Sequence, residues 1–464
     1  MRLLQVVILS IILACSQAKP HPGDFFKKPI FKDFYGVIHA DIKDGDAGDP
    51  LILTPLIQQN RIKEAQEASE VVLDDFMGVK SYAGYLTVDE AYGSNLFFWF
   101  FPSESNWDTD PVILWLQGGP GAPSEFGIFD ENGPFYFALD GQLTLRNTSW
   151  TKSHSVVYFD QPAGTGFSFT NGGYARNQTK VGDDLYNGLY QFFQLFPNLQ
   201  SNDFFITGES YGGKYVPATA HAIHRRNPND EMKINLKGIA IGNGFVHPEY
   251  QLRYAEYLYQ HGFVDGNTKK QLEDTENKAV EQIKQKNWKA AAELLNVDLD
   301  NIGDNIDIPS IYNYLYLVTP VDVDTYMDAF LAREDVRRAL HVGNTVYNDG
   351  NVYDNLSQDI PKSITPWLSE LLNHYRVLVY NGQTDIIVAY PMTVEYVKNL
   401  NYSSAEEYKT ATRRTWKYGE DVAGYVKSAG NLTEVMVRNA GHMVPTDQPE
   451  WALDLITRFV KNDL

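Results

Sequence analysis

The pentapeptide Gly208-Glu209-Ser210-Tyr211-Gly212 matches the pattern G-x-S-x-G. It follows a short apolar run over residues 204–207 and precedes a stretch with helical character. Glycines on both sides of a serine allow the sharp strand-to-helix turn that exposes a nucleophilic Oγ. The pattern also arises by chance in a chain with 35 glycines. Its place between a strand and a helix favours the interpretation that Ser210 is a nucleophile.

A serine hydroxyl needs a neighbouring base before it can attack. In folds with this turn, the acid and then the histidine follow the serine, each after a later strand. Of the ten histidines, only His442 follows the last predicted strand, on a glycine-bearing loop. Asp385 follows the strand before it and is predicted to hold the His442 ring by accepting its other N–H.

Acyl transfer also needs donors for the oxyanion of the tetrahedral intermediate. Gln117-Gly118-Gly119-Pro120-Gly121 follows an apolar run over residues 112–116 and forms a tight turn. We predict that the backbone N–H of Gly119 and that of Tyr211, the residue after the nucleophile, form the oxyanion hole.

The elements that must position these residues alternate along the chain. Strands are predicted at 81–88, 96–102, 112–116, 156–159, 204–207, 239–241, 377–380 and 434–438, and helices at 181–196 and 215–226. This alternation predicts an α/β fold with a mostly parallel central sheet flanked by helices. Residues 77–247 and 374–464 would form the core, and 248–373 a mainly helical insertion over the active site. Residues 19–76 show no compact pattern and read as an N-terminal extension or a propeptide.

The first eighteen residues indicate entry into the secretory pathway. Arg2, an apolar run and the small residues before and at Ala18 predict a signal peptide over 1–18. The one cysteine, Cys15, lies inside it, so the mature chain would form no disulfide. N-x-S/T triplets give candidate glycosylation sites at Asn147, Asn177, Asn355, Asn401 and Asn431.

The composition of the chain limits the kinds of molecule that it is expected to bind. The chain has 464 residues, of which 43% are hydrophobic, enough for a large core. A net charge of −20 disfavours nucleic acid and anionic membranes as partners and suits an acidic compartment. After the signal peptide no apolar run is long enough to cross a bilayer, so no membrane anchor is expected.

With these residues assembled, the chain resembles the serine carboxypeptidase family, which has the α/β-hydrolase fold, and within it the vitellogenic-like carboxypeptidases. The resemblance is carried by six motifs, at 115–121, 160–168, 207–217, 238–244, 380–385 and 441–445. It implies removal of single residues from the C-terminus of peptides through an acyl-enzyme at acidic pH, with no metal or organic cofactor. The expected partners are peptides with a free C-terminal carboxylate; the oligomeric state, a homodimer included, stays open.

The resemblance also implies a site for the substrate's terminal carboxylate. Glu131 and Glu209 match the family's acidic pair, with Gln117 and Gly118 beside them, and Met443 matches a residue lining the pocket for the departing side chain. Two close carboxyls share a proton at low pH and can then donate to a carboxylate, whereas at neutral pH both would be ionised and repel it. Gln117 stands where many relatives have Asn, and Ala122 and the insertion lack the family's usual cysteines.

Three other functions remain open on the sequence. An acyltransferase or esterase could use the same triad on another substrate, although it would have no terminal carboxylate to bind. A catalytically silent carrier, or a structural glycoprotein, could use the same fold as an interaction surface. The sequence also leaves open secretion against lysosomal delivery, zymogen activation and the side-chain preference.

Overall fold

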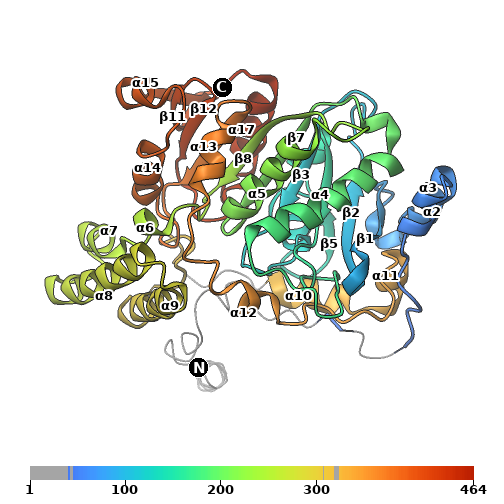
Figure 1. Ribbon diagram of the computed structural model, residues 1–464, viewed down its shortest axis with the longest axis horizontal. Helices are drawn as coiled ribbons and strands as arrows, with labels where there is room; N and C mark the ends of the chain where they lie inside the picture. The colour runs from blue at the N-terminus through green and yellow to red at the C-terminus, as the bar shows by residue number, and fades with distance from the viewer. Residues whose placement is uncertain (1–39, 42–44, 307, 318–322) are drawn as a thin grey trace, which may run out of the picture.

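A ten-stranded sheet forms the centre of the molecule (Figure 1). The computed structural model describes residues 40–41, 45–306, 308–317 and 323–464, so the predicted signal peptide with Cys15 lies outside the described residues. The strand order is β1-β2-β6-β3-β7-β8-β9-β12-β11-β10. The six strands from β6 to β12 run parallel, and two antiparallel strands flank them on each side. The bounds are β1 Tyr82–Asp89, β2 Ser94–Phe101, β3 Val112–Leu116, β6 Ser155–Phe159, β7 Phe204–Glu209, β8 Leu236–Gly242, β9 Arg376–Gly382, β10 Arg414–Tyr418, β11 Asp421–Ala429 and β12 Leu432–Val437.

Both faces of the sheet are buried, which explains why its central strands read as continuous apolar runs. Successive side chains of a strand point to opposite faces. On β3, Leu114 therefore packs in one core, while Ile113 and Trp115 pack in the other. All eight predicted strands are present, and the predicted α/β-hydrolase class is confirmed.

Helices cover each face. One core takes apolar residues from α4, α5, α13 and α14, and the other from α10, α11 and α17. Figure 1 shows α4 and α5 lying across the front of the sheet. The bounds are α4 Gln178–Leu195, α5 Gly212–Arg226, α10 Val323–Leu331, α11 Glu334–Ala339, α13 Thr365–Leu371, α14 Tyr390–Lys398, α15 Ala405–Thr410, α16 Val444–Asp447 and α17 Pro449–Lys461.

The segment predicted as an insertion is mainly helical. Besides α10, α11 and α13, it contains α6 Pro248–Gln251, α7 Tyr254–Gln260, α8 Gly266–Lys284, α9 Trp288–Asn305 and α12 Val352–Leu356. Helices α7 to α9 form a lobe beside one end of the sheet (Figure 1). Helices α8 and α9 are separate, because Lys286 takes a left-handed backbone conformation with φ 60° just after the end of α8.

The described part of the N-terminal segment packs on the body of the molecule. Helices α2 (Thr54–Gln58) and α3 (Ile62–Ser69) lie beside β1 (Figure 1). The N–H of Leu53 donates to Tyr85 O at 2.9 Å, and Tyr85 N–H donates to Leu51 O at 2.9 Å. Leu53 and Phe76 are buried. Residues 51–76 therefore extend the core, although the sequence shows no compact pattern there.

The sequence patterns did not predict β10 and β11, the antiparallel strands at the end of the sheet. On β10 only Trp416 is buried, so the segment carries no apolar run. The small hairpin of β4 (Phe135–Phe137) and β5 (Leu143–Leu145) was missed as well, because each strand has three residues.

A pair of buried carboxyls, Glu125 and Asp160, lies beneath the turn that follows β3. Glu125 is 2% exposed and Asp160 is 1% exposed. Asp160 accepts backbone N–H bonds from Ser124 at 2.9 Å and Phe167 at 2.8 Å, and Tyr347 Oη lies 3.4 Å from Glu125 Oε2. Burial raises the pKa of Glu125 well above its ordinary value, with the Asp160 charge adding to it, and burial raises the pKa of Asp160 to about 6.

This pair predicts a stability that depends on pH. A carboxyl whose pKa is raised by folding keeps its proton in the folded state after the unfolded chain has lost it, so stability falls as pH rises. We expect the free energy of unfolding to decrease between pH 4.5 and pH 7, and Glu125→Gln to reduce that decrease by about 1–3 kcal/mol, since one pKa unit corresponds to about 1.4 kcal/mol. Urea unfolding at several pH values measures it. The exposed Glu231→Gln variant is the control, and an unchanged slope in Glu125→Gln contradicts the prediction.

Candidate active site

Ser210 occupies the sharp turn between β7 and α5. Its φ of 59° is left-handed, as a nucleophile elbow requires. Flanking glycines allow β3 to approach, since a Cβ would lie 2.6 Å from Leu116 O at Gly208 and 2.9 Å from it at Gly212. The Ser210 N–H donates to Gly242 O at 3.1 Å, and its carbonyl accepts from Phe245 N at 2.8 Å. The elbow is therefore fixed on both sides by backbone.

Asp385 and His442 meet after β9 and β12. His442 Nδ1 lies 2.8 Å from Asp385 Oδ2, and both side chains are completely buried. Since a carboxylate oxygen accepts, the contact places the proton of the neutral ring on Nδ1 and leaves Nε2 as the basic nitrogen. The two loops are also tied together, because Thr384 N–H donates to Ala440 O at 2.8 Å.

A stretch of the segment predicted as an insertion lies directly on these two loops. His442 N–H donates to Tyr312 O at 2.7 Å, and Tyr314 N–H donates to Thr384 O at 3.2 Å. The side chain of Asn313 joins the loops: it accepts from Thr384 Oγ1 at 2.8 Å and donates to Asp447 Oδ2 at 3.0 Å. Residues 311–316 thus form part of the wall of the site.

The glycine turn after β3 packs against the elbow. A Cβ on Gly118 would lie 2.6 Å from Ser210 Cβ and 2.7 Å from Tyr211 N. Gly119 has a φ of +99°, a conformation that L side chains rarely adopt. The structure therefore brings the turn that carries Gly119 into contact with the residue that carries the second predicted oxyanion donor, Tyr211.

Gln117, Glu131 and Glu209 form a buried polar cluster beside the turn. Gln117 Nε2 lies 3.0 Å from Glu131 Oε1 and 3.4 Å from Glu209 Oε1. Trp115 Nε1–H donates to Gln117 Oε1 at 2.8 Å. Because the indole N–H can only donate, it fixes the amide oxygen and leaves the NH₂ group to face the two carboxyls.

The two glutamates share their environment. Each is at most 1% exposed, and their carboxyls hydrogen-bond each other. Burial raises the pKa of Glu131 to about 8, and burial with the Glu131 charge raises the pKa of Glu209 well above its ordinary value. The pair therefore keeps a proton at neutral pH, where the sequence-based expectation has both ionised.

A π-helical turn, η4 (Gly127–Glu131), places Glu131. Asn132 N–H donates to Gly127 O at 2.9 Å, and such turns are frequent at functional sites. Arg146 holds the segment that follows, donating to Phe129 O at 2.8 Å, Phe135 O at 3.0 Å and Gly133 O at 3.1 Å. Arg146 carries no motif signal, and sequence reasoning missed it.

The remaining predicted residues lie at the surface or beside the core. Met443 directly follows His442, is half-buried and packs against the core on the α17 face. Among the sequon asparagines, Asn355 is half-buried and donates to Asn351 O at 2.9 Å. The other four, Asn147, Asn177, Asn401 and Asn431, are exposed.

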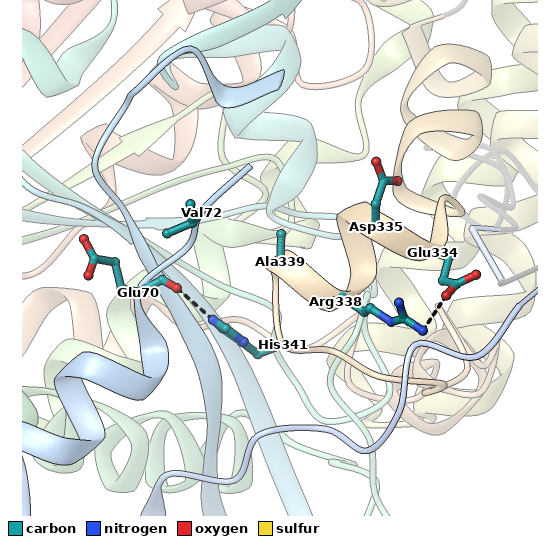
Figure 2. A pocket seen from close by; sticks show the side chains of 7 residues that line it. All are labelled: Glu70, Val72, Glu334, Asp335, Arg338, Ala339 and His341. Atoms are coloured by element: carbon teal, nitrogen blue, oxygen red, sulfur yellow. Dashed lines mark hydrogen bonds and ion pairs between the residues drawn. The ribbon is translucent and has the colours of Figure 1, made fainter. Parts of the chain in front are cut away.

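A surface cavity of about 560 Å³ lies away from this cluster, between the end of α3 and α11 (Figure 2). Its lining includes Glu70, Arg338 and His341, and His341 Nε2 lies 3.0 Å from Glu70 O. None of the predicted site residues lines it.

Over the described residues, no group of three or more His, Cys, Asp or Glu side chains is placed to hold a metal ion. No helix in the described ranges is long and apolar enough to cross a bilayer.

Comparisons with known proteins agree on one family. The family model of serine carboxypeptidases matches residues 72–462. The chain is 49% identical over 435 residues to the venom serine carboxypeptidase of Apis mellifera, covering 91% of this chain and 93% of the bee protein. It is 44% identical over 471 residues to the human "probable serine carboxypeptidase CPVL", covering 98% and 96%, and 44% identical over 430 residues to the vitellogenic carboxypeptidase of Aedes aegypti, covering 90% and 91%.

Among solved structures, the chain is similar to Kex1(delta)p, a prohormone-processing carboxypeptidase from Saccharomyces cerevisiae. The TM-score is 0.73 at 25% identity, covering 86% of this chain and 96% of the yeast protein.

The contact between the glycine turn and the elbow predicts the effect of a single methyl group. In Gly118→Ala the added Cβ meets Ser210 Cβ and Tyr211 N, so the turn must move away from the elbow. We expect the acylation of Ser210 by a small activated ester, such as p-nitrophenyl acetate, to slow about 100-fold or more, comparable to the loss of one oxyanion donor. Gly266→Ala, where a Cβ meets nothing within 4 Å, is the control. A folded Gly118→Ala protein that reacts at the normal rate contradicts the assignment.

Proposed function

This chain belongs to the serine carboxypeptidase family and is a serine-type carboxypeptidase, and on that premise we propose which residues perform the reaction and how they select the peptide end. The observation that carries the proposal is the buried carboxyl cluster beside the Ser210 elbow. A hydrolase of internal bonds or esters has no use for two carboxyls that hold a proton there.

Ser210, His442 and Asp385 act as nucleophile, base and orienting acid. His442 Nε2 removes the Ser210 Oγ proton as Oγ attacks the last peptide carbonyl, and it then gives this proton to the departing amine. The C–N bond breaks, and the rest of the peptide stays on Ser210 as an ester. Water, deprotonated by His442, then hydrolyses that ester and restores the hydroxyl. The 2.8 Å contact between His442 Nδ1 and Asp385 Oδ2 supports these roles.

Gly119 and Tyr211 supply the oxyanion donors. Their N–H groups belong to two turns that pack on each other at Gly118 and Ser210, and donors held in place need no reorganisation when charge develops. Removing one such donor costs roughly 3–4 kcal/mol of barrier in a serine protease.

Glu131 and Glu209 recognise the terminal carboxylate of the substrate, with Gln117 and the Gly118 backbone beside them. A protonated carboxyl donates a hydrogen bond to a carboxylate, whereas an ionised one repels it. Since burial raises the pKa of Glu131 to about 8, binding is complete in acid and is lost as pH rises through that value. Met443 lines the pocket for the departing side chain. An ester substrate of an acyltransferase or esterase lacks the carboxylate that this cluster fits.

The protein enters the secretory pathway and works in an acidic extracellular or lysosomal setting. The predicted signal peptide and the exposed sequons at Asn147, Asn177, Asn401 and Asn431 support this route, with Asn355 as a fifth candidate. Peptides with a free C-terminal carboxylate are the expected partners.

A pair of matched peptides tests the function. A short N-blocked peptide with a free C-terminus should lose its last residue, the same peptide amidated should react at least 100-fold more slowly in kcat/KM at pH 5, and Ser210→Ala should release nothing. Mass spectrometry of the products gives the result. Equal rates on acid and amide, or release of internal fragments, would show a different acyl-transfer activity.

The carboxyl pair predicts how KM depends on pH. For the free-acid peptide, we expect KM of the wild type to rise about tenfold between pH 5 and pH 9, because the pair loses the proton that it donates. In Glu131→Gln the amide donates at every pH, so KM should change less than about threefold. Glu434→Gln is the matched control, since Glu434 is equally buried but binds the hydroxyls of Tyr390 and Tyr408. A tenfold rise in Glu131→Gln would remove Glu131 from carboxylate recognition.

A further inference from the structure

Asn243 is not a member of the triad, but it lies in a turn that contacts Ser210, Asp385 and the loop of His442. It follows β8, the strand between β7 and β9, and its side chain is completely buried. Its φ of 42° is left-handed, a conformation that asparagine tolerates better than most residues. The turn therefore sends this side chain toward the loop that carries Asp385.

The side chain of Asn243 makes three hydrogen bonds. Its Nδ2 donates to Asp385 Oδ2 at 2.7 Å and to Gly441 O at 3.2 Å, and its Oδ1 accepts from Gly382 N at 3.1 Å. The backbone N–H of Gly382 can only donate, and Gly441 O can only accept. These partners fix which end of the amide faces Asp385.

The carboxylate of Asp385 depends on this bond. Among the described residues it accepts hydrogen bonds only at Oδ2, from His442 and from Asn243, and Oδ1 has no partner. The charged and titratable groups that face Asp385 are His442 after β12, Glu209 on β7, Asp447 on α16 and Tyr257 on α7, whose Oη donates to Asp385 O at 3.1 Å. Two of them are carboxyls, and none is a lysine or arginine. A buried polar group is costly unless it is hydrogen-bonded, so the bond from Asn243 is one of the two that hold this carboxylate in place.

The same turn also holds the nucleophile and the base loop. Its neighbours Gly242 and Phe245 make the two backbone bonds to Ser210, and the Gly441 carbonyl held by Asn243 belongs to the residue before His442. One short turn thus contacts the nucleophile by its backbone and the acid and base loops by a single amide.

We propose that Asn243 is a positioning residue for the triad: its amide orients the Asp385 carboxylate and fixes the acid loop relative to the His442 loop. The inference rests on the proposed roles of Ser210, Asp385 and His442. Asn243 does not contact the reacting atoms. Its loss should therefore lower kcat and leave KM nearly unchanged.

The test follows acylation of Ser210 by a small activated ester, p-nitrophenyl acetate, which reports nucleophile activation without peptide binding. It also measures kcat and KM on the free-acid peptide. We expect Asn243→Ala to slow acylation and kcat by about 10- to 100-fold, the range found for side chains that orient metal-binding histidines, with KM within about threefold. Asn202→Ala is the matched control: Asn202 is also buried and donates two bonds to carbonyls, of Trp107 and Asp110, at the other edge of the sheet.

Asn243→Asp separates positioning from packing. The added carboxyl has the size of the amide and can donate to Asp385 only while it holds a proton. The acylation rate relative to wild type should therefore be highest at pH 5 and fall at least fivefold by pH 8. A merely structural role would give a ratio that does not change with pH.

The outcomes distinguish a failure of the proposed triad from a failure of the role proposed for Asn243. Wild-type protein that does not react with the reagent, or Ser210→Ala that does, overturns the proposed triad. Reactive wild type together with Asn243→Ala at the rate of Asn202→Ala overturns only the role of Asn243. If Asn243→Ala does not fold, a ratio for Asn243→Asp that stays constant from pH 5 to pH 8 overturns it as well.

Discussion

The parallel pairing of β7, β8, β9 and β12 is the constraint on which the site depends. Glu209 lies opposite Gly242 across β7 and β8, and Gly242 lies opposite Tyr380 across β8 and β9. Because parallel strands end at the same edge, the residues that follow them meet without long loops. A slip of one residue in any pair would reverse the faces of that strand and separate Ser210 from His442.

Burial is the second feature on which the site depends, because it favours the protonated form of Glu131 and Glu209. Glu209, Asp385 and His442 are fully buried, and Glu131 is 1% exposed. In so dry a setting an ionised carboxyl must be hydrogen-bonded, or it takes up a proton. Asp385 has donors in His442 and Asn243, whereas Glu131 and Glu209 hydrogen-bond each other and keep a proton. The buried carboxyls of the site therefore differ in their partners: Asp385 accepts from a histidine and an amide, whereas Glu131 and Glu209 face each other.

The features that could be predicted are those that leave a pattern in a short stretch of sequence. Apolar runs located eight strands of the sheet, and Asp385 and His442 were selected because each follows a strand that comes after Ser210. Arg146 and Asn313 gave no such signal, because their partners are distant backbone carbonyls and loop side chains that only the folded chain brings near. Strand β10 was missed because it is mostly exposed, so its sequence contains no apolar run. Glu131 could be singled out only by family resemblance, since its burial arises from a π-helical turn.

The segment from Gln117 to Glu131 links the two acid pairs. Gln117 and Glu131 belong to the buried polar cluster with Glu209, while Glu125 in the same segment pairs with Asp160. Both pairs hold protons that lone carboxyls would have lost, and both lose them as pH rises. The segment also contains the turn that packs on Ser210, so the proposed oxyanion hole and the proposed carboxylate site both depend on its conformation. If Glu131 and Glu209 bind the substrate carboxylate as proposed, rising pH would weaken substrate binding and the fold of this segment together, because both depend on buried carboxyls that keep a proton.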